Sequence, residues 1–301
     1  MNQHNRARAI KGYLFVITSA VIFGVMPMLV LFIYADGANS MTVTLLRNLL
    51  SAPALAALAL VQKKSLRVPR KALPSLGLIA LLGCSVTPLL LSSSYNYLAS
   101  GTATVFHFIY PAAVAVGGFL FLKEKLNKGT LISMLLCVLG ICLFYTPGAP
   151  LDPVGSILAL ASGLTYAAYI LLLAHFRYTQ INGFLFTFYI VTFSSAVMLT
   201  VGLISGQLAF PGSLGGWLLC LFVSLIVNVG AVMLFQQGTF LIGGQRAAIL
   251  STAEPLTSVL VGALFLQEAV SLQTALGSFC VIAAGVLITL SDFKKAEDSE
   301  D

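Results

Sequence analysis

The sequence predicts an all-α integral membrane protein: ten transmembrane helices arranged as two inverted five-helix repeats, with the N- and C-termini in the cytoplasm. Three observations predict this fold: an apolar composition, an alternating distribution of basic residues, and an internal repeat. Hydrophobic residues make up 58% of the 301 residues and charged residues 9%, whereas soluble proteins carry roughly 25% charged residues. This composition excludes a soluble enzyme, a disordered regulator and a nucleic-acid-binding protein, despite the net charge of +6.

The lengths of the apolar runs define the spans. A helix crosses the roughly 30 Å hydrocarbon core in about 20 residues. Ten runs have about this length: 12–34, 41–61, 73–94, 102–122, 130–146, 153–174, 183–204, 215–236, 247–266 and 273–291. The first run is longer than a signal-peptide h-region of about 7–15 residues, so it is kept as a helix. The five cysteines lie inside these runs, where we expect packing positions and no disulfide framework.

The basic residues predict the orientation, because cytoplasmic loops carry the excess of Lys and Arg. They precede the first run and follow the even-numbered runs, whereas the loops after the odd-numbered runs hold none. On the predicted cytoplasmic side are Arg6, Arg8, Lys11, Lys63, Lys64, Arg67, Arg70, Lys71, Lys123, Lys125, Lys128, Arg177, Arg246, Lys294 and Lys295. The exception is Arg47, inside the second run. Both termini are therefore predicted to be cytoplasmic, and the short acidic tail to be a solvated end.

The two halves of the chain resemble each other. The segment Tyr110-Pro111…Gly118-Phe-Leu-Phe-Leu-Lys-Glu124 matches Glu254-Pro255…Gly262-Ala-Leu-Phe-Leu-Gln-Glu268 without a gap. The seam is the Pro/Gly-rich stretch 147–153, which divides the chain into repeats 1–148 and 149–301. Because each repeat has an odd number of helices, the second enters the membrane from the opposite side. Such inverted repeats are typical of secondary transporters, whose substrate site lies near the midplane between the halves.

This paired pattern, in a ten-helix chain of about 300 residues, resembles the EamA-type family of the drug/metabolite transporter superfamily. The resemblance covers nearly the whole chain and specifies the family better than the substrate. It implies a ten-helix inverted repeat that exports, or sometimes takes up, small metabolites such as amino acids, nucleobase-like compounds and amphiphilic toxins. Tyr110-Pro111 and Glu254-Pro255 fit the family pattern. Lys123 stands where a Gly often precedes the Glu, and we expect no functional consequence.

Glu254 is the clearest candidate for chemistry, since ionisable residues inside a membrane usually face the bundle interior and serve function. Pro255 and Pro111 each remove a helical hydrogen bond, which predicts a kink and a free carbonyl, at Ser251 and His107 respectively. Desolvation favours a protonated carboxyl, so Glu254 could couple export to proton entry. Alternatively it pairs with a cationic group of the substrate, or is a structural carboxyl bonded to a neighbouring helix.

His107 lies one turn before Pro111, and a relay with Glu254 is conceivable because histidine titrates near neutrality. The alternative is a hydrogen-bonded core histidine. Arg47 is the one basic residue inside a span, and a similarly placed Arg is usual in the resembling family. We expect it to snorkel to the external interface, or to pair with a carbonyl or with Asp36, in a structural or gating role rather than in contact with an anionic substrate.

Other polar and aromatic residues complete the candidate cavity: Asn96, Tyr110, Tyr166, Tyr169, Asn228 and Gln236, with Tyr95 and Gln237 nearby in sequence. A cavity with aromatic walls and a few amide groups suits a mostly apolar or aromatic zwitterion. Each residue alone could equally serve interhelical packing or an interfacial belt. Glu124 and Glu268 end the two kinked runs, where they are candidates for caps or for repeat-related gates.

Together these features predict a secondary transporter that exports small organic metabolites, amino-acid-like or drug-like, by alternating access. The expected partners are the substrate, protons as a candidate coupling ion, and membrane lipids, with no nucleic acid; a homodimer is left open. No Walker A sequence, cofactor motif or metal-ligand spacing occurs. The alternatives are a membrane-embedded enzyme acting on apolar or lipid-linked substrates and a non-transporting membrane sensor. The expected location is the plasma membrane, as a multi-pass protein, which in a prokaryote is the inner membrane.

Overall fold

The computed structural model describes residues 3–62, 67–98, 100–124, 128–143, 152–265 and 272–297. The described residues form helices and connecting turns, and no strand occurs among them. Several residues that the sequence analysis singled out lie outside these ranges: Lys63, Lys64, Lys125, the seam Pro147, Gly148 and Pro150, Glu268, and the end of the acidic tail.

The helices follow the predicted runs in order, and five of the runs are divided into shorter elements. The elements are α1 (Gln3–Ala35), α2 (Ser40–Leu49), α3 (Ala52–Val61), the 3-10 helix η1 (Arg70–Ala72), α4 (Leu73–Ala80), the π-helix η2 (Leu81–Val86), α5 (Thr87–Ser94), α6 (Ser100–His107), α7 (Tyr110–Leu122), α8 (Lys128–Leu143), α9 (Pro153–Phe176), α10 (Gly183–Ser205), α11 (Leu214–Ser224), the π-helix η3 (Leu225–Val232), α12 (Met233–Ile242), α13 (Gly244–Leu250), α14 (Ala253–Phe265) and α15 (Leu272–Glu297).

The apolar helices make this a multi-pass membrane protein. Among the described residues, six helical segments are long and apolar enough to cross a membrane, and shorter apolar helices accompany them. Large apolar side chains are exposed on their outer faces; Ile204 and Phe121, for example, are 82% and 77% exposed. Such surfaces suit contact with lipid and not with water. The count of ten spans and the side on which the termini lie stay predictions.

One predicted boundary is wrong. The eighth run was expected to span 215–236, with Gln236 as a candidate cavity residue near its end. The helix instead continues through α12 to Ile242. Gln236 is fully buried and accepts a hydrogen bond of 2.7 Å from Thr187 Oγ1 on α10. A partner on a neighbouring helix thus bonds the side-chain oxygen of this buried amide.

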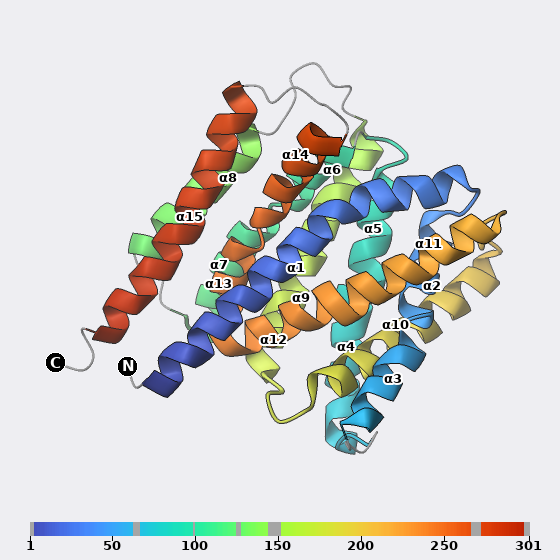
Figure 1. Cartoon of the computed structure of the whole chain (residues 1–301), viewed down its shortest axis with the longest axis horizontal. Coiled ribbons are helices and arrows are strands. Elements are labelled where there is room, and N and C mark those ends of the chain that lie inside the picture. The colour runs from blue at the N-terminus through green and yellow to red at the C-terminus, as the bar shows by residue number, and fades with distance from the viewer. Residues whose placement is uncertain are drawn as a thin grey trace.

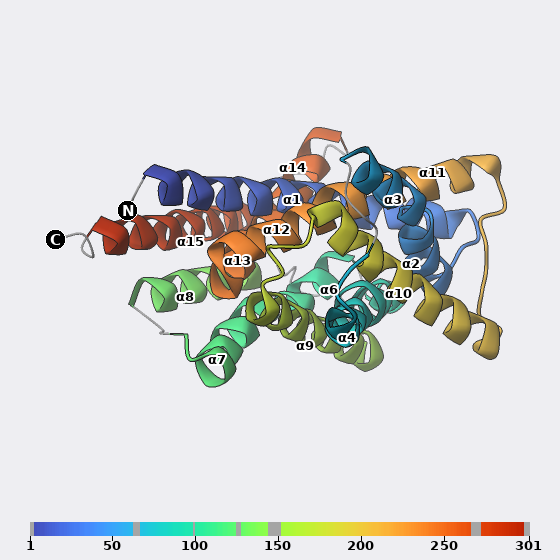
Figure 2. The same ribbon diagram turned by 90° about the horizontal axis from the view of Figure 1, so that it is seen from below.

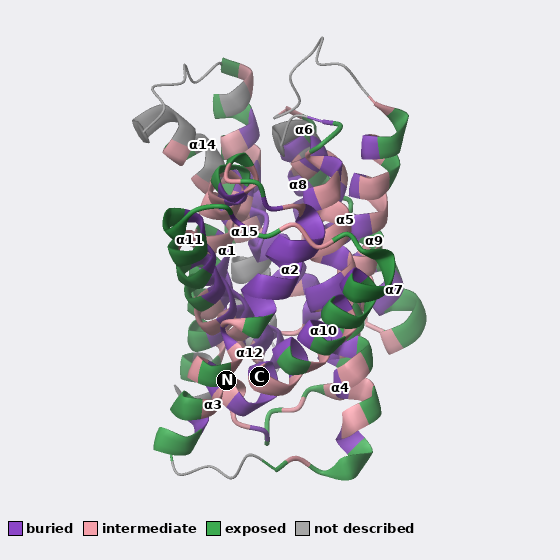
Figure 3. Ribbon diagram, turned by 90° about the vertical axis from the view of Figure 1, so that its right-hand side faces the viewer, coloured by how far each residue is buried: buried purple, intermediate pink, exposed green. Residues whose placement is uncertain are grey.

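The helices form a bundle, and α2, most of whose residues are buried, lies near its centre (Figure 3). Figure 1 shows α1 running along α12 and α14, while α8 and α15 lie side by side at one flank. α10 packs against α2, α3 and α4 on the other side of the molecule. The first turns of α1 and the last turns of α15 lie at the same end, as Figure 2 also shows.

Two π-helices occupy equivalent places in the two halves of the chain. η2 begins at Leu81 and η3 at Leu225, and this separation is the same as that between Tyr110 and Glu254 in the sequence repeat. π-helical turns are rare and are often found at functional sites. The residue pattern of these segments does not predict them. Their equivalent positions show that the repeat extends to the local irregularities of the fold.

A polar cluster, formed by Asn48, Ser51, Ser85, Ser194 and Asn228, ties the π-helices to α2 and α10. Ser85 donates to Ser194 at 2.8 Å, and Asn228 donates to Ser51 at 3.0 Å. These two contacts are related by the repeat, since each pair combines equivalent helices of opposite halves. Asn48 joins them by donating to Ser194 at 2.9 Å. All five residues are fully buried, so their mutual bonds fix the helices in one register.

Candidate functional site

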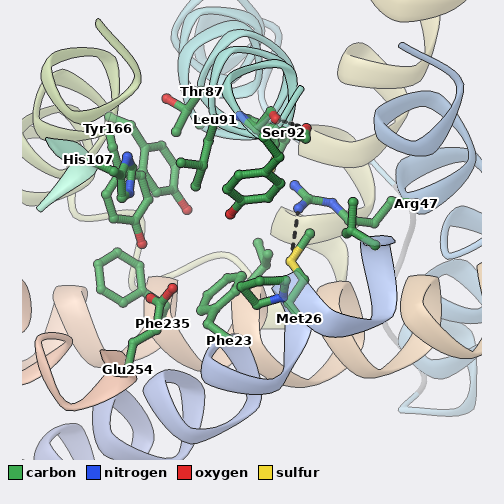
Figure 4. A pocket seen from close by; sticks show the side chains of 18 residues that line it. Phe23, Met26, Arg47, Thr87, Leu91, Ser92, His107, Tyr166, Phe235 and Glu254 are labelled. Atoms are coloured by element: carbon green, nitrogen blue, oxygen red, sulfur yellow. Dashed lines mark hydrogen bonds between the residues drawn. The ribbon is translucent and has the colours of Figure 1, made fainter. Parts of the chain in front are cut away.

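A pocket lies between the two halves of the chain (Figure 4). Its empty space measures about 750 Å³, including the part open to solvent. The residues that line it are Phe23, Met26, Pro27 and Val30 of α1, Arg47 of α2, Gly83 and Cys84 of η2, Thr87, Pro88, Leu91 and Ser92 of α5, Tyr95, His107 of α6, Tyr166 and Tyr169 of α9, Val232 of η3, Phe235 of α12 and Glu254 of α14. Most of the wall is apolar or aromatic, with a few ionisable side chains, as in small-molecule sites generally.

The predicted kinks are confirmed as breaks in the helices that border this pocket. α6 ends at His107 and α7 begins at Tyr110; α13 ends at Leu250 and α14 begins at Ala253. The two joints stand at equivalent places in the repeats, each just before a buried proline, Pro111 or Pro255. Broken helices at membrane depth are tolerated where they are buried or line a cavity.

The prediction of free carbonyls at these joints is wrong for Ser251. Its carbonyl accepts a hydrogen bond from the Glu254 backbone N–H at 3.0 Å, so a tighter turn takes up the bond that Pro255 removes. The carbonyl of His107 is covered by Gly163 of α9, where a Cβ would collide with it. At the second joint, a Cβ built on Gly24 of α1 would lie 2.6 Å from the carbonyl oxygen of Glu254. Each joint is thus crossed closely by a glycine of a neighbouring helix.

Glu254 directs its carboxyl into the pocket from the first turn of α14 (Figure 4). Negative charge is stabilised near a helix N-terminus, so the carboxylate has some support from the helix itself. Within the described residues, no side chain donates a hydrogen bond to this carboxyl, so it is available to a proton or to a ligand. His107 also lines the pocket, but no hydrogen bond joins it to Glu254 in the described structure, and a direct relay is therefore not assembled.

His107 belongs to a hydrogen-bonded cluster of buried rings. Its Nδ1 lies 2.8 Å from Ser162 Oγ. Because Ser162 donates its one hydroxyl hydrogen to the Ala159 carbonyl, Nδ1 is assigned as the donor, and Nε2 is left as an acceptor in the neutral ring. The imidazole ring centroid lies 5.3 Å from that of Tyr110 and 5.4 Å from that of Tyr166.

Tyr110 does not line the pocket as predicted, but it links the two broken helices. Its hydroxyl lies 2.7 Å from Ser251 Oγ, and Ser251 in turn donates to the Ala248 carbonyl, so Tyr110 is the donor. The tyrosine stands at the first joint and the serine at the second. Its ring packs edge-on against Tyr166 at 4.9 Å between centroids. Tyr110 therefore supports the pocket wall from behind.

Arg47 enters the pocket and does not snorkel to the membrane surface, because its side chain is 5% exposed and lines the cavity. Its Nη1 approaches Met26 Sδ at 3.6 Å, while Nε has no hydrogen-bond partner. The predicted partner, Asp36, is engaged elsewhere: its carboxylate accepts the Ser213 backbone N–H at 3.0 Å. Hydrogen bonds from Ser213 and Gly212 hold the pKa of the Asp36 carboxyl below its ordinary value.

Three predicted amide residues lie outside the pocket. Asn96 is exposed beyond α5, and Asn228 is part of the polar cluster, where it donates to the Arg47 carbonyl at 2.6 Å. Gln236 is bonded to Thr187 through its Oε1, while its Nε2 has no hydrogen-bond partner. Asn228 and Gln236 therefore hold neighbouring helices together beside the cavity. A buried amide that makes no hydrogen bond is costly.

Glu124 also lies away from the pocket, directly after α7. Its backbone N–H donates to the Gly118 carbonyl at 3.0 Å, which closes the end of the helix. Burial raises the pKa of its half-buried carboxyl, while the charges of Arg246 and Arg177 act in the opposite direction. It therefore belongs to a small charged group where the ends of α7 and α9 meet the start of α13.

The pocket residues that the sequence did not predict come mainly from α1, η2 and α5. Phe23 and Met26 were not singled out, and Cys84 was assigned to packing with the other cysteines. Gly83 leaves room for the Tyr169 ring, which lies where a Cβ would stand, but this contact joins distant segments and is visible only in the folded structure. Within the described part of the chain, no group of three or more His, Cys, Asp or Glu residues could hold a metal ion.

Comparison with known proteins gives consistent matches. The model of the EamA-like transporter family matches residues 10–146 and 153–290. An uncharacterized transporter of Archaeoglobus fulgidus is 31% identical over 60% of this chain and 62% of its own length. The uncharacterized transporter YcbK of Bacillus subtilis is 27% identical over 89% of both chains. The uncharacterized inner membrane transporter YicL of Salmonella typhimurium is 26% identical over 95% of this chain and 97% of its own.

A solved structure shares the fold. It is 18% identical in sequence and superposes with a TM-score of 0.74, covering 93% of this chain and 96% of that chain. At this identity the likeness concerns the fold alone. Another protein therefore adopts the same arrangement of helices over almost the whole of its own chain.

Proposed function

We propose, from the premise that this chain belongs to the EamA-like transporter family, that it is a secondary transporter that exports small organic metabolites, amino-acid-like or drug-like. Family membership and the names of the relatives indicate a membrane transporter and not an enzyme. The observation that carries the proposal is the pocket at the boundary of the two halves, bordered by both broken helices. Secondary transporters place their substrate sites at such a boundary.

Alternating access would follow from the pseudo-symmetry of the two halves. At the end that holds the termini, α1 and α12 cross closely at Gly12 and Gly238. The repeat-related contact lies between Gly155 of α9 and Leu98 after α5, where an added Cβ would lie 2.8 Å from Leu98 Cγ. Opening one contact while the other stays closed would expose the pocket to one side at a time.

The membrane topology forms part of the proposal. Ten spans with both termini in the cytoplasm would place the basic residues on the inner side, in the plasma membrane. The relative YicL is named an inner membrane transporter, which supports this location. Reporter fusions after Phe176 and after Ser205 should report opposite sides of the membrane, and equal signals would contradict the topology.

Transport is tested with purified protein in liposomes. Vesicles loaded with a metabolite extract are incubated with and without an imposed proton gradient, and the released compounds are identified by mass spectrometry. We expect release of a few small amphiphilic compounds above the level of protein-free vesicles. Release that equals the protein-free level for every compound would refute the proposed transport.

Glu254 is proposed to bind the coupling proton, because its carboxyl faces the pocket without a partner among the described side chains. Glu254→Gln keeps the shape and removes the titrating group. We expect it to abolish the response of flux to a proton gradient while exchange of substrate across the membrane continues. The matched control is Asp36→Asn, which removes a carboxylate at the loop outside the pocket. Unchanged gradient dependence in the Gln variant would refute the coupling role.

A further inference from the structure

We infer that the pocket binds monocarboxylates with an aromatic or bulky apolar body, and that Arg47 holds the carboxylate. The inference rests on the proposed function, because it specifies the class of molecule that is transported. It differs from the structural or gating role expected from the sequence. Four features of the pocket carry it: an arginine without a counter-ion, a fixed backbone beneath it, the balance of charge, and an aromatic wall.

The first feature is that Arg47 is buried without a protein partner for its charge. An arginine inside a membrane is costly and is normally paired. Among the described residues no carboxylate forms an ion pair with it, and the sulfur of Met26 is a weak acceptor. Its Nε is buried and unbonded, although unbonded buried donors are rare and call for an explanation. An anionic ligand in the pocket would supply the missing acceptor.

The second feature is that the backbone of Arg47 is held in place. Its carbonyl accepts hydrogen bonds from Ser224 at 2.7 Å and from Asn228 at 2.6 Å, both from the other half of the chain. The guanidinium therefore projects from a fixed point into the cavity, as Figure 4 shows. A backbone that is already held in place does not have to be ordered when the ligand binds, and this part of the preorganisation favours affinity.

The third feature is the balance of charge. Among the residues that line the pocket, Arg47 is the one Lys or Arg. One guanidinium balances one negative charge, and its planar fork matches the two oxygens of a carboxylate. A phosphate monoester carries up to two negative charges and would leave one of them unbalanced in this apolar cavity. Glu254 lies across the pocket from Arg47 (Figure 4), so a ligand carboxylate is attracted to Arg47 and, when Glu254 has released its proton, repelled from Glu254.

The fourth feature is the aromatic wall beside these two charges. The rings of Tyr166, Tyr169 and Phe235 stack nearly parallel: Tyr166 lies 5.7 Å from Phe235 at 26°, and Tyr169 lies 5.6 Å from Tyr166 at 25°. Phe23 adds apolar surface from α1. A flat aromatic or bulky apolar body packs well against such rings. The wall therefore selects the body of the ligand, and Arg47 its charged end.

Binding measurements on the purified full-length protein test this inference. The probes are 3-phenylpropionate, indole-3-propionate and L-phenylalanine, each compared with its amide by isothermal titration. A hydrogen bond to a charged group favours the acid by roughly ten- to a hundredfold. We expect at least one acid to bind about tenfold more tightly than its amide. In Arg47→Gln this ratio should fall to about one while the affinity for the amide is retained, and Arg47→Lys should lie between.

The controls separate binding from folding and from transport. Arg70→Gln, which removes an exposed arginine at the start of η1, should leave the acid-to-amide ratio unchanged. A variant that simply misfolds would lose the amide as well as the acid. A preference for the acid that Arg47→Gln abolishes supports the inference even if liposomes show no flux. Acid and amide bound equally by the wild-type protein, or a preference kept by Arg47→Gln, would overturn it while leaving transport intact.

Discussion

The crossing of α1 and α12 at the end that holds the termini yields a quantitative prediction. Gly12 and Gly238 allow these helices to touch: a Cβ built at Gly238 would lie 2.5 Å from Val16 Cγ2 and 3.1 Å from the Gly12 carbonyl oxygen. The first contact involves a side chain and the second a backbone atom that cannot rotate away. Gly238→Ala should therefore push the two helices apart and favour the conformation in which this end is open.

The size of the shift follows from the cost of overpacking. Adding a methyl group to a well-packed contact costs typically about 1–3 kcal/mol. A difference of 1.4 kcal/mol changes an equilibrium constant by about a factor of ten. The population of the open conformation should therefore rise roughly five- to 150-fold, as long as the closed conformation remains the more populated one. Alanine also gains about 1 kcal/mol of helix propensity over glycine. The control Gly77→Ala shares this gain, but its added Cβ meets nothing within 4 Å.

The assay measures access to the closed contact. In a chain whose native cysteines are replaced, Ala20→Cys places one thiol on α1, one turn beyond Val16 and 1% exposed. The rate of its modification by N-ethylmaleimide reports the open population. We expect Gly238→Ala to accelerate modification at least fivefold over Gly77→Ala. Equal rates in the two variants would refute the idea that this crossing closes the pocket at this end.

Three further predictions concern two supports of the pocket and the charged group at Glu124. Tyr110→Phe removes the hydrogen bond to Ser251 between the two joints and should cost about 0.5–1.5 kcal/mol, seen as a lower melting temperature in detergent; an unchanged value would contradict the link. Asn228→Ala leaves buried partners unbonded and should cost roughly 1–3 kcal/mol, whereas Asn96→Ala at the exposed position should cost nothing measurable. Burial raises the pKa of Glu124, so the folded protein holds this proton more tightly than the unfolded chain, and stability should fall as the pH rises above about 4.5 towards the folded-state pKa. Glu124→Gln should remove this part of the pH dependence of melting, and a profile identical to wild type would refute the assignment.

The features that the sequence predicted well depend on local rules. Apolar run lengths determine where helices lie, and proline removes a backbone donor wherever it stands. The helices and the breaks before Pro111 and Pro255 could therefore be read directly. Glu254 and His107 were assigned to a cavity because polar side chains in apolar runs need an interior place, and both line the pocket.

The features that it missed depend on contacts between distant segments. Asn228 looked like a ligand group because its partners, the Arg47 carbonyl and Ser51, lie about 180 residues away in the chain. Arg47 was expected to snorkel to the external interface or to pair with a carbonyl or with Asp36, because these are the general solutions for a lone arginine inside a span, and only the folded structure shows a cavity beside it. The π-helices leave no comparable pattern, since they follow from hydrogen bonds that the assembled bundle selects.

The symmetry of the scaffold and the asymmetry of the pocket have different consequences. Joints, π-helices and the polar cluster recur in both halves, as the proposed exchange of roles between the two halves requires. The two charges that face the pocket do not recur. By the repeat offset, Glu254 corresponds to Tyr110, and Arg47 falls at Ile190 or its neighbour Val191, both buried and apolar. A ligand with one charged end would consequently meet a site with one preferred orientation, and it would keep that orientation while the symmetric scaffold opens to either side.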